Sequence, residues 1–313
     1  MTARTPMRLV LSTTQDVVEA VPAILGFHPH NSFVMLAVDG SNAVFGGRSD
    51  LAANIEEIPS AISAMLRPAV SNDAKGVILF VYDDEPRWPY LLEAAYAAYE
   101  EAGVPVIDLI HVHHGTADSK KRPHETVTLD QPGKIAAQVA YEGRAASRDR
   151  EEHVTRVASD VDPARFLPAY EFTPEEAREF AVHVRDRIAG EELTLDEVIR
   201  LAAAVHDDVA RDLLLERIMT TSRTPGGPQW WASVARNTPS CPDTQHLFGL
   251  IALGLYMNGE GALCWGVLDR APVGTNLVNL ALQLLRQGVK PDRVAERHAI
   301  DFADQPEDTK ENA

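Results

Sequence analysis

A change of hydrophobic periodicity near Pro132 constrains the fold of this 313-residue chain more than any other feature. Before Pro132, short apolar runs alternate with stretches of helical spacing; after it, only helical spacing remains. Strand-like runs between helices are typical of an α/β domain, whereas continuous helical periodicity indicates a helical domain. We therefore predict an α/β sheet domain over residues 1–131, with α+β as the alternative, then a helical domain over 132–300 and a disordered polar tail over 301–313.

The predicted sheet domain contains one run, residues 77–81, that is apolar throughout. Such a run favours a central strand covered on both faces. Two further runs, residues 33–38 and 43–45, meet around Asp39-Gly40 and predict a hairpin that follows a helix ending at Leu25-Gly26. The central strand spans 76–82, and we expect other strands at 8–11 and 106–111, a possible edge strand at 125–129, and helices at 16–25, 57–66 and 88–102.

The predicted helical domain begins with Pro132 in a first helical turn, from which a long polar helix is expected to run toward Ser159. Thr173 and Thr194 each precede acidic residues in the way that helix N-caps do. Further helices are expected at 207–219, 230–237, 244–258, 261–268 and 276–287. No strand longer than a few residues is expected after Pro132.

The charge of the chain excludes several classes of partner. It has 29 Lys and Arg residues against 46 Asp and Glu residues, a net charge of −17, which repels nucleic-acid backbones and anionic membranes. Two cysteines, Cys241 and Cys264, are too few for a disulfide framework or a cysteine-based zinc site. The chain also shows no signal peptide, and its longest nearly apolar run falls well short of the roughly 20 residues that span a bilayer. We predict a cytoplasmic protein that binds neither membranes nor nucleic acid non-specifically.

Polar residues follow two of the predicted strands. Arg48 and Asp50 end one of them, and Tyr82-Asp83 end the central one. Ligands of open α/β sheets bind outside the carboxyl ends of strands, and arginine suits a carboxylate or phosphate. One interpretation is therefore a pocket for a small anionic ligand, and the alternative is a structural Arg–Asp ion pair, which we favour. The candidate ligand-binding residues are Ser32, Arg48, Asp50, Tyr82, Asp83, Arg144 and Arg148.

A cluster of histidines raises the possibility of a metal site. Alternation places His111 and His113 on one side of a strand, and His124 or Asp118 is near enough in sequence to add a ligand. Histidines are also common where a strand leads into a polar loop, and we favour that interpretation, as we do for His28 and His30. Neither a nucleophile elbow nor a glycine-rich phosphate loop is present, so we predict no cofactor and leave catalytic residues unassigned.

Several short motifs occur in a fixed order along the chain. They are L-G-F-x-P-x-x-S at 25–32, R-x-D-L at 48–51, Y-D-D at 82–84, G-R at 143–144, S-R at 147–148, V-A-R-D at 209–212, M-N-G-E-G-A-L at 257–263 and L-L-R-Q-G-V-K-P at 284–291. In this order they resemble DUF4192, an actinobacterial family known as a domain of unknown function. Arginine outnumbers lysine 23 to 6, as in chains from GC-rich genomes, which agrees with an actinobacterium or one of its phages.

Two classes of function stay open on the sequence. An acidic chain with a helical second half and no recognisable catalytic motif predicts a non-catalytic interaction or regulatory module whose helical half binds a partner protein. The alternative is an enzyme or sensor for a small anionic ligand at the strand ends. The resemblance adds no activity to either of these, because the family has no assigned function.

Overall fold

The computed structural model describes residues 9–51, 54–84, 88–142, 146–166, 170–220, 224, 226–272 and 274–303. Within these ranges the chain forms two compact units that meet in the sequence between His153 and Val154. We call the part up to His153 the sheet unit and the part from Val154 onward the helical unit. Each unit is described by itself.

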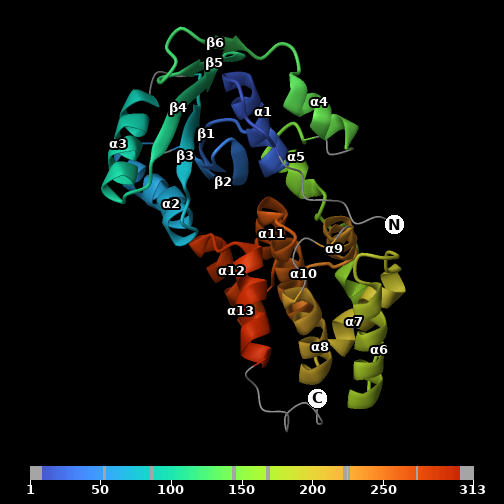
Figure 1. Cartoon of the computed structure of the whole chain (residues 1–313). Helices are drawn as coiled ribbons and strands as arrows, with labels where there is room; N and C mark the ends of the chain where they lie inside the picture. Colours follow the sequence, from blue (N-terminus) through green and yellow to red (C-terminus); the bar gives the residue numbers. More distant parts are fainter. Residues whose placement is uncertain are drawn as a thin grey trace. The chain divides into compact units, whose positions relative to one another are not determined.

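The sheet unit is built on a six-stranded sheet with the order β2-β1-β3-β4-β5-β6 (Figure 1). Its strands are β1 (Ser32–Asp39), β2 (Asn42–Asp50), β3 (Gly76–Tyr82), β4 (Val106–His113), β5 (Thr116–Ser119) and β6 (Thr126–Thr128). In this sheet β3 and β4 are parallel and the other neighbours are antiparallel. The parallel pair is joined through helix α3 (Trp88–Glu101), which is the crossover that parallel strands require.

Helices cover both faces of this sheet (Figure 1). Helices α2 (Ile58–Ser71) and α3 share a core with Phe33 and Met35 of β1, whereas α1 (Thr14–Leu25) and α4 (Lys134–Tyr141) share a core with Val34 and Leu36. Successive side chains of a strand point to opposite faces, so β1 is buried on both sides. The same alternation holds in β3, where the continuously apolar run predicted a central strand.

Two short strands complete the sheet beyond β4. His114 and Gly115 connect β4 to β5, and both have positive φ, +43° and +74°. Two such residues are typical of a type I′ turn, whose twist matches that of the flanking strands. The sequence did not predict β5, while the edge strand β6 falls within the predicted range 125–129. Of the strand predicted at 8–11, the described residues form an isolated bridge between Val10 and Asn42.

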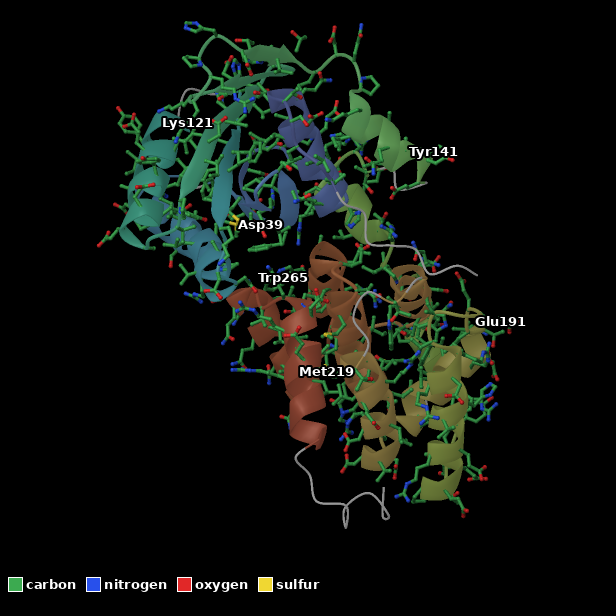
Figure 2. The ribbon with its side chains drawn as sticks, in the orientation of Figure 1. Asp39, Lys121, Tyr141, Glu191, Met219 and Trp265 are labelled. Carbon is green, nitrogen blue, oxygen red and sulfur yellow. The ribbon has the colours of Figure 1, made fainter. Side chains whose placement is uncertain are left out.

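The prediction of a single long helix from Pro132 toward Ser159 is wrong. α4 ends at Tyr141 and α5 (Arg150–Thr155) begins nine residues later, with residues 146–149 non-helical. α4 buries Ile135 and Val139 in the core beside α1, while the Tyr141 side chain at its end is 94% exposed (Figure 2). α4 therefore packs within the sheet unit, although it lies beyond the predicted domain boundary at residue 131.

The helical unit contains η2 (Pro163–Phe166) and η3 (Pro242–Thr244) as short 3₁₀ helices. Its α-helices are α6 (Pro174–Arg187), α7 (Leu195–Ala204), α8 (Asp208–Met219), α9 (Gly227–Arg236), α10 (Gln245–Met257), α11 (Gly261–Leu268), α12 (Asn276–Gln287) and α13 (Pro291–Ala303). The described residues of this unit contain no strand, which confirms the predicted helical second half. The predicted tail overlaps the end of α13, and its residues 304–313 lie outside the described residues.

α10 forms the centre of the helical unit, because almost its whole length is buried. Trp230 and Trp231 of α9 are buried beside it, with ring centroids 4.8 Å apart and edge-to-face. A Cβ atom added at Gly254 of α10 would lie 2.2 Å from the Trp231 ring. The absence of a side chain at Gly254 therefore lets the two helices pack closely.

Candidate functional site

A pocket of about 610 Å³ lies at the edge of the sheet where β3 and β4 end. Five segments of the sheet unit line it: α1, the loop before β1, the end of β3, the β4–β5 turn and the loop that leads into α4. Both strand ends reach this edge because β3 and β4 are parallel. The carboxyl ends of strands are where α/β proteins bind ligands, and the volume is in the usual range for a small molecule.

The loop before β1 is held in place by hydrogen bonds to a distant segment. The Ser147 amide donates to the Gly26 carbonyl at 2.8 Å, and the His28 amide donates to the Ser147 carbonyl at 3.0 Å. The Ser32 hydroxyl then donates to the His30 carbonyl at 2.7 Å. His28 and His30 are exposed, as the sequence predicted, and they also line the pocket.

Another part of the lining depends on an acidic side chain of α1. The Glu19 carboxylate accepts a hydrogen bond from the Ala136 amide at 3.1 Å and another from the Gly133 amide. These amides begin α4, where the helix dipole favours a negative charge. Glu19 therefore joins α1 to α4 and fixes the loop that contributes Asp130 to the lining.

The lining is acidic and rich in histidine. Its described residues include Glu19, Asp83, Asp84, Asp130, His28, His30, His113 and His114, and none of these described lining residues is lysine or arginine. The His114 amide donates to Asp84 at 2.7 Å, and this hydrogen bond lowers the pKa of the Asp84 carboxyl. Although the residue is exposed, the walls of the pocket partly desolvate the His28 ring, and this desolvation, together with the nearby His30, lowers its pKa. Acidic residues thus stand in the described lining without any lysine or arginine beside them.

One histidine of the lining is oriented by a chain of hydrogen bonds. His113 Nε2 lies 2.7 Å from Asp118 Oδ2, and the Thr126 hydroxyl donates to Asp118 Oδ1 at 2.7 Å. These two bonds lower the pKa of Asp118, so its carboxylate accepts and His113 Nε2 donates. The neutral imidazole then has its lone pair on Nδ1, the arrangement of a general base held by a carboxylate.

The imidazole of His111 packs against the His113 ring. The two rings stack with centroids 4.3 Å apart. His111 Nε2 donates to the Asp83 carbonyl at 2.7 Å, which joins β4 to the end of β3. The two histidines share one side of β4, as the sequence predicted, but these bonds point them at a carbonyl and a carboxylate.

No group of three or more His, Cys, Asp or Glu side chains is arranged to hold a metal ion within the described residues. Of the metal ligands considered from the sequence, His124 lies on an exposed turn. Asp118 contacts His113 directly, so the two are hydrogen-bond partners here.

The seven candidate ligand residues fall into separate groups. Arg48 donates from Nε to the Ser32 hydroxyl at 2.8 Å and pairs through Nη2 with Asp50 at 2.7 Å, and these three residues do not line the pocket. Tyr82 and Asp83 do line it. Arg148 is exposed and pairs with Asp149 at 2.9 Å, and Arg144 lies outside the described residues.

The sheet order explains why Arg48 and Asp83 are not neighbours. β2 and β3 do run in the same direction, because each is antiparallel to β1. However, β1 lies between them, so their ends are two strand spacings apart, roughly 10 Å. Pocket residues that the sequence analysis missed include Glu19, Asp84, His114 and Asp130. A usable signal was the His114-Gly115 pair directly after a strand, which marks a tight hairpin turn.

A comparison with protein families extends these observations. In the described part of the chain no helix is long and apolar enough to cross a membrane. Searches of curated proteins and of solved structures found no significant match. The model of the family described as a domain of unknown function, DUF4192, matches residues 15–292 and so includes most of both units. The chain therefore belongs to the DUF4192 family.

Proposed function

We propose that this protein binds a small cationic ligand, such as a protonated amine, in the pocket at the ends of β3 and β4. The observation that supports the proposal is the acidic lining, which has four acidic residues and neither lysine nor arginine among those of its residues that the structure describes. Negative charge in a concave site concentrates cations from solution and stabilises them once bound.

The contacts of Asp84 suit this role. Its Oδ1 atom accepts from the His114 amide, which fixes a carboxylate that lines the pocket. Within the described residues no donor contacts Oδ2, which can accept a hydrogen bond from an ammonium group. Val18, Pro22, Val112 and Leu129 add an apolar wall for the carbon skeleton of the ligand.

The proposal differs from the anionic ligand considered from the sequence. That expectation needed arginines at the strand ends, and the described arginines among them are paired elsewhere, Arg48 with Asp50 and Arg148 with Asp149. A partner protein for the helical half stays a prediction.

Proton transfer on the bound ligand is a second candidate function. The oriented His113–Asp118 pair supports it, because Nδ1 of His113 would accept a proton from an ammonium group and leave a neutral, nucleophilic amine. The transferred proton stays within the complex, so it shows itself in the charge of the His113 ring. Nitrogen chemical shifts of the imidazole, measured by NMR, should report the imidazolium form when an amine is bound, and this signal should be absent from His113→Gln. A ring that stays neutral with the amine bound would contradict the transfer.

Isothermal titration calorimetry with putrescine, agmatine and spermidine tests the main proposal. We expect at least one of these amines to bind, 1,4-butanediol not to bind, and Asp84→Asn to weaken the amine about tenfold, which corresponds to about 1.4 kcal/mol. Asp39→Asn is the matched control, because Asp39 (Figure 2) is exposed at the opposite end of β1 from Ser32. Equal losses in the two variants, or binding of acetate and phosphate in place of amines, would contradict the proposal.

A further inference from the structure

A second pocket, of about 380 Å³, lies in the helical unit between α6 and α7. On α6 its lining follows one helical face, with Glu176, Glu179, Phe180 and His183 at the spacing i, i+3, i+4 and i+7. Glu197 and Arg200 of α7 and Phe172, which precedes α6, complete it. The pocket thus combines acidic, basic and aromatic side chains, and it is separate from the site in the sheet unit.

Aromatic rings hold the Arg200 side chain in place. Its guanidinium carbon lies 4.4 Å from the centroid of the Phe180 ring and 5.9 Å from that of Phe172. The Tyr170 ring is a third neighbour at 5.7 Å. Stacking of this kind is favourable for a guanidinium and fixes its plane, and it uses none of the five N–H donors.

These donors lack acceptors among the described residues. Arg200 makes no hydrogen bond or ion pair there, and its Nε atom is shielded from solvent without a partner. Two of the three glutamates that line the pocket with it, Glu176 and Glu197, are engaged elsewhere. Glu197 pairs with Arg187 and accepts from the Thr194 amide at 2.8 Å, and the Arg187 hydrogen bond lowers its pKa to about 2. Glu176 caps α6 through Thr173. A planar anion that accepts two parallel N–H bonds would satisfy the Arg200 guanidinium.

The opposite charge in the pocket is equally unused. Glu179 is exposed on the same face of α6 and makes no hydrogen bond or ion pair within the described part of the chain. Glu179 and Arg200 line one pocket, yet they do not pair with each other. A ligand that carries both charges would neutralise both residues. A simple anion would leave Glu179 without a countercharge, and a simple cation would leave Arg200 without one.

We propose that this pocket binds a free α-amino acid. Arg200 holds the α-carboxylate through parallel N–H bonds, and Glu179 accepts from the α-ammonium group. Phe172 and Phe180 contact the side chain of the ligand, so amino acids with apolar side chains bind best. The inference does not rest on the proposed function of the sheet unit, because the two pockets share no residue.

Calorimetric titration of the intact protein with L-leucine and L-phenylalanine tests this proposal. Each is compared with its methyl ester, which lacks the carboxylate, and with its N-acetyl derivative, which lacks the ammonium group. We expect the free amino acids to bind and both derivatives to bind at least tenfold more weakly. The proposal is overturned if no free amino acid binds, or if either derivative binds as well as its parent.

Variants locate the site. Arg200→Lys keeps the charge but loses the planar pair of donors, so we expect at least a tenfold loss of affinity for L-leucine. Glu179→Gln should weaken L-leucine and leave its N-acetyl derivative unaffected. Glu175→Gln, one turn earlier on α6 and outside the lining, is the matched control, and it should bind as the native protein does. Equal effects at Glu175 and Glu179 would overturn the proposal.

Two further measurements separate the possible failures. The thermal midpoint of each variant is measured without ligand, and because Glu179 is exposed its variant stays informative if Arg200→Lys is unstable. Asp84→Asn is included as a third variant, and it should leave L-leucine binding unchanged. If Asp84→Asn abolishes L-leucine binding, the amino acid binds in the sheet unit and the assignment to α6 and α7 is wrong.

Discussion

At the scale of single residues, the candidate sites depend on which side chains are charged at neutral pH. Burial lowers the pKa of His28, and it also lowers those of His111 and His246. At pH 7 these three imidazoles are therefore neutral in the folded protein. Of the three, His28 lines the sheet pocket, where the pKa of the Asp84 carboxyl is lowered as well. Protonation of His28 in acid would make that pocket less negative.

These shifts predict that stability falls on acidification. A histidine whose pKa is lower in the folded state favours folding above its unfolded pKa of about 6.5, and this contribution is lost as pH falls through the folded pKa. His111→Gln keeps a donor for the Asp83 carbonyl but cannot titrate. We expect it to flatten the fall in unfolding free energy between pH 7 and pH 5, measured by urea titration. An unchanged slope would show that His111 does not contribute.

At the scale of elements, hydrogen bonds between residues far apart in the sequence hold the walls of the sheet pocket in place. Glu19 of α1 reaches amides that lie 114 and 117 residues later. Ser147 holds the loop of His28 in a similar way. Each contact crosses the sheet unit, so no local pattern in the sequence points to it.

Glu19→Ala should loosen α4 in particular. The loss of a cap and of a favourable dipole interaction is expected to cost roughly 1 kcal/mol of unfolding free energy. Hydrogen exchange should become faster at the Gly133 and Ala136 amides, which lose their acceptor. Glu100→Ala, an exposed position of α3, is the control and should leave both amides protected. Unchanged exchange in Glu19→Ala would mean that α4 is held without the cap.

Gly254→Ala tests the close packing of α9 and α10. Helix propensity alone would make alanine more favourable than glycine by about 1 kcal/mol. The Trp231 ring occupies the space of the new methyl group, so we expect a net loss of roughly 1–3 kcal/mol in chemical denaturation. Gly261→Ala in α11 has its nearest neighbour at 3.6 Å and should be neutral or stabilising. A stabilised Gly254→Ala would show that Trp231 can move aside.

The sequence predicted most of the elements and part of the sheet site. Period-2 and continuous apolar runs identified β1, β3 and β4, and the rule about strand ends identified Tyr82 and Asp83 as lining residues. The prediction from sequence failed where the position of a residue depends on the order of the strands and on tertiary contacts. The insertion of β1 between β2 and β3 separates Arg48 from Asp83. The acidic lining residues Glu19 and Asp130 come from helix α1 and from the loop after the edge strand β6, not from the ends of β3 and β4.

At the scale of the whole molecule, the two units have cores of their own. The sheet unit buries apolar residues on both faces of its sheet, and the helical unit buries them around α10. A unit with its own core can fold alone. We expect a fragment of residues 1–155, which keeps α5 whole, to give dispersed amide NMR signals and a cooperative thermal transition. A fragment without either would show that the sheet unit needs the rest of the chain.

The placement of the tryptophans gives each unit its own optical signal. Trp230, Trp231 and Trp265 belong to the helical unit, and the remaining one of the four, Trp88, belongs to the sheet unit by its position in the chain. The edge-to-face pair Trp230–Trp231 is buried, so its emission spectrum should shift to longer wavelength when the helical unit unfolds. Intrinsic fluorescence therefore follows mainly one half of the molecule, and any unfolding of the sheet unit at a different temperature would appear as a mismatch between fluorescence and circular dichroism melting curves.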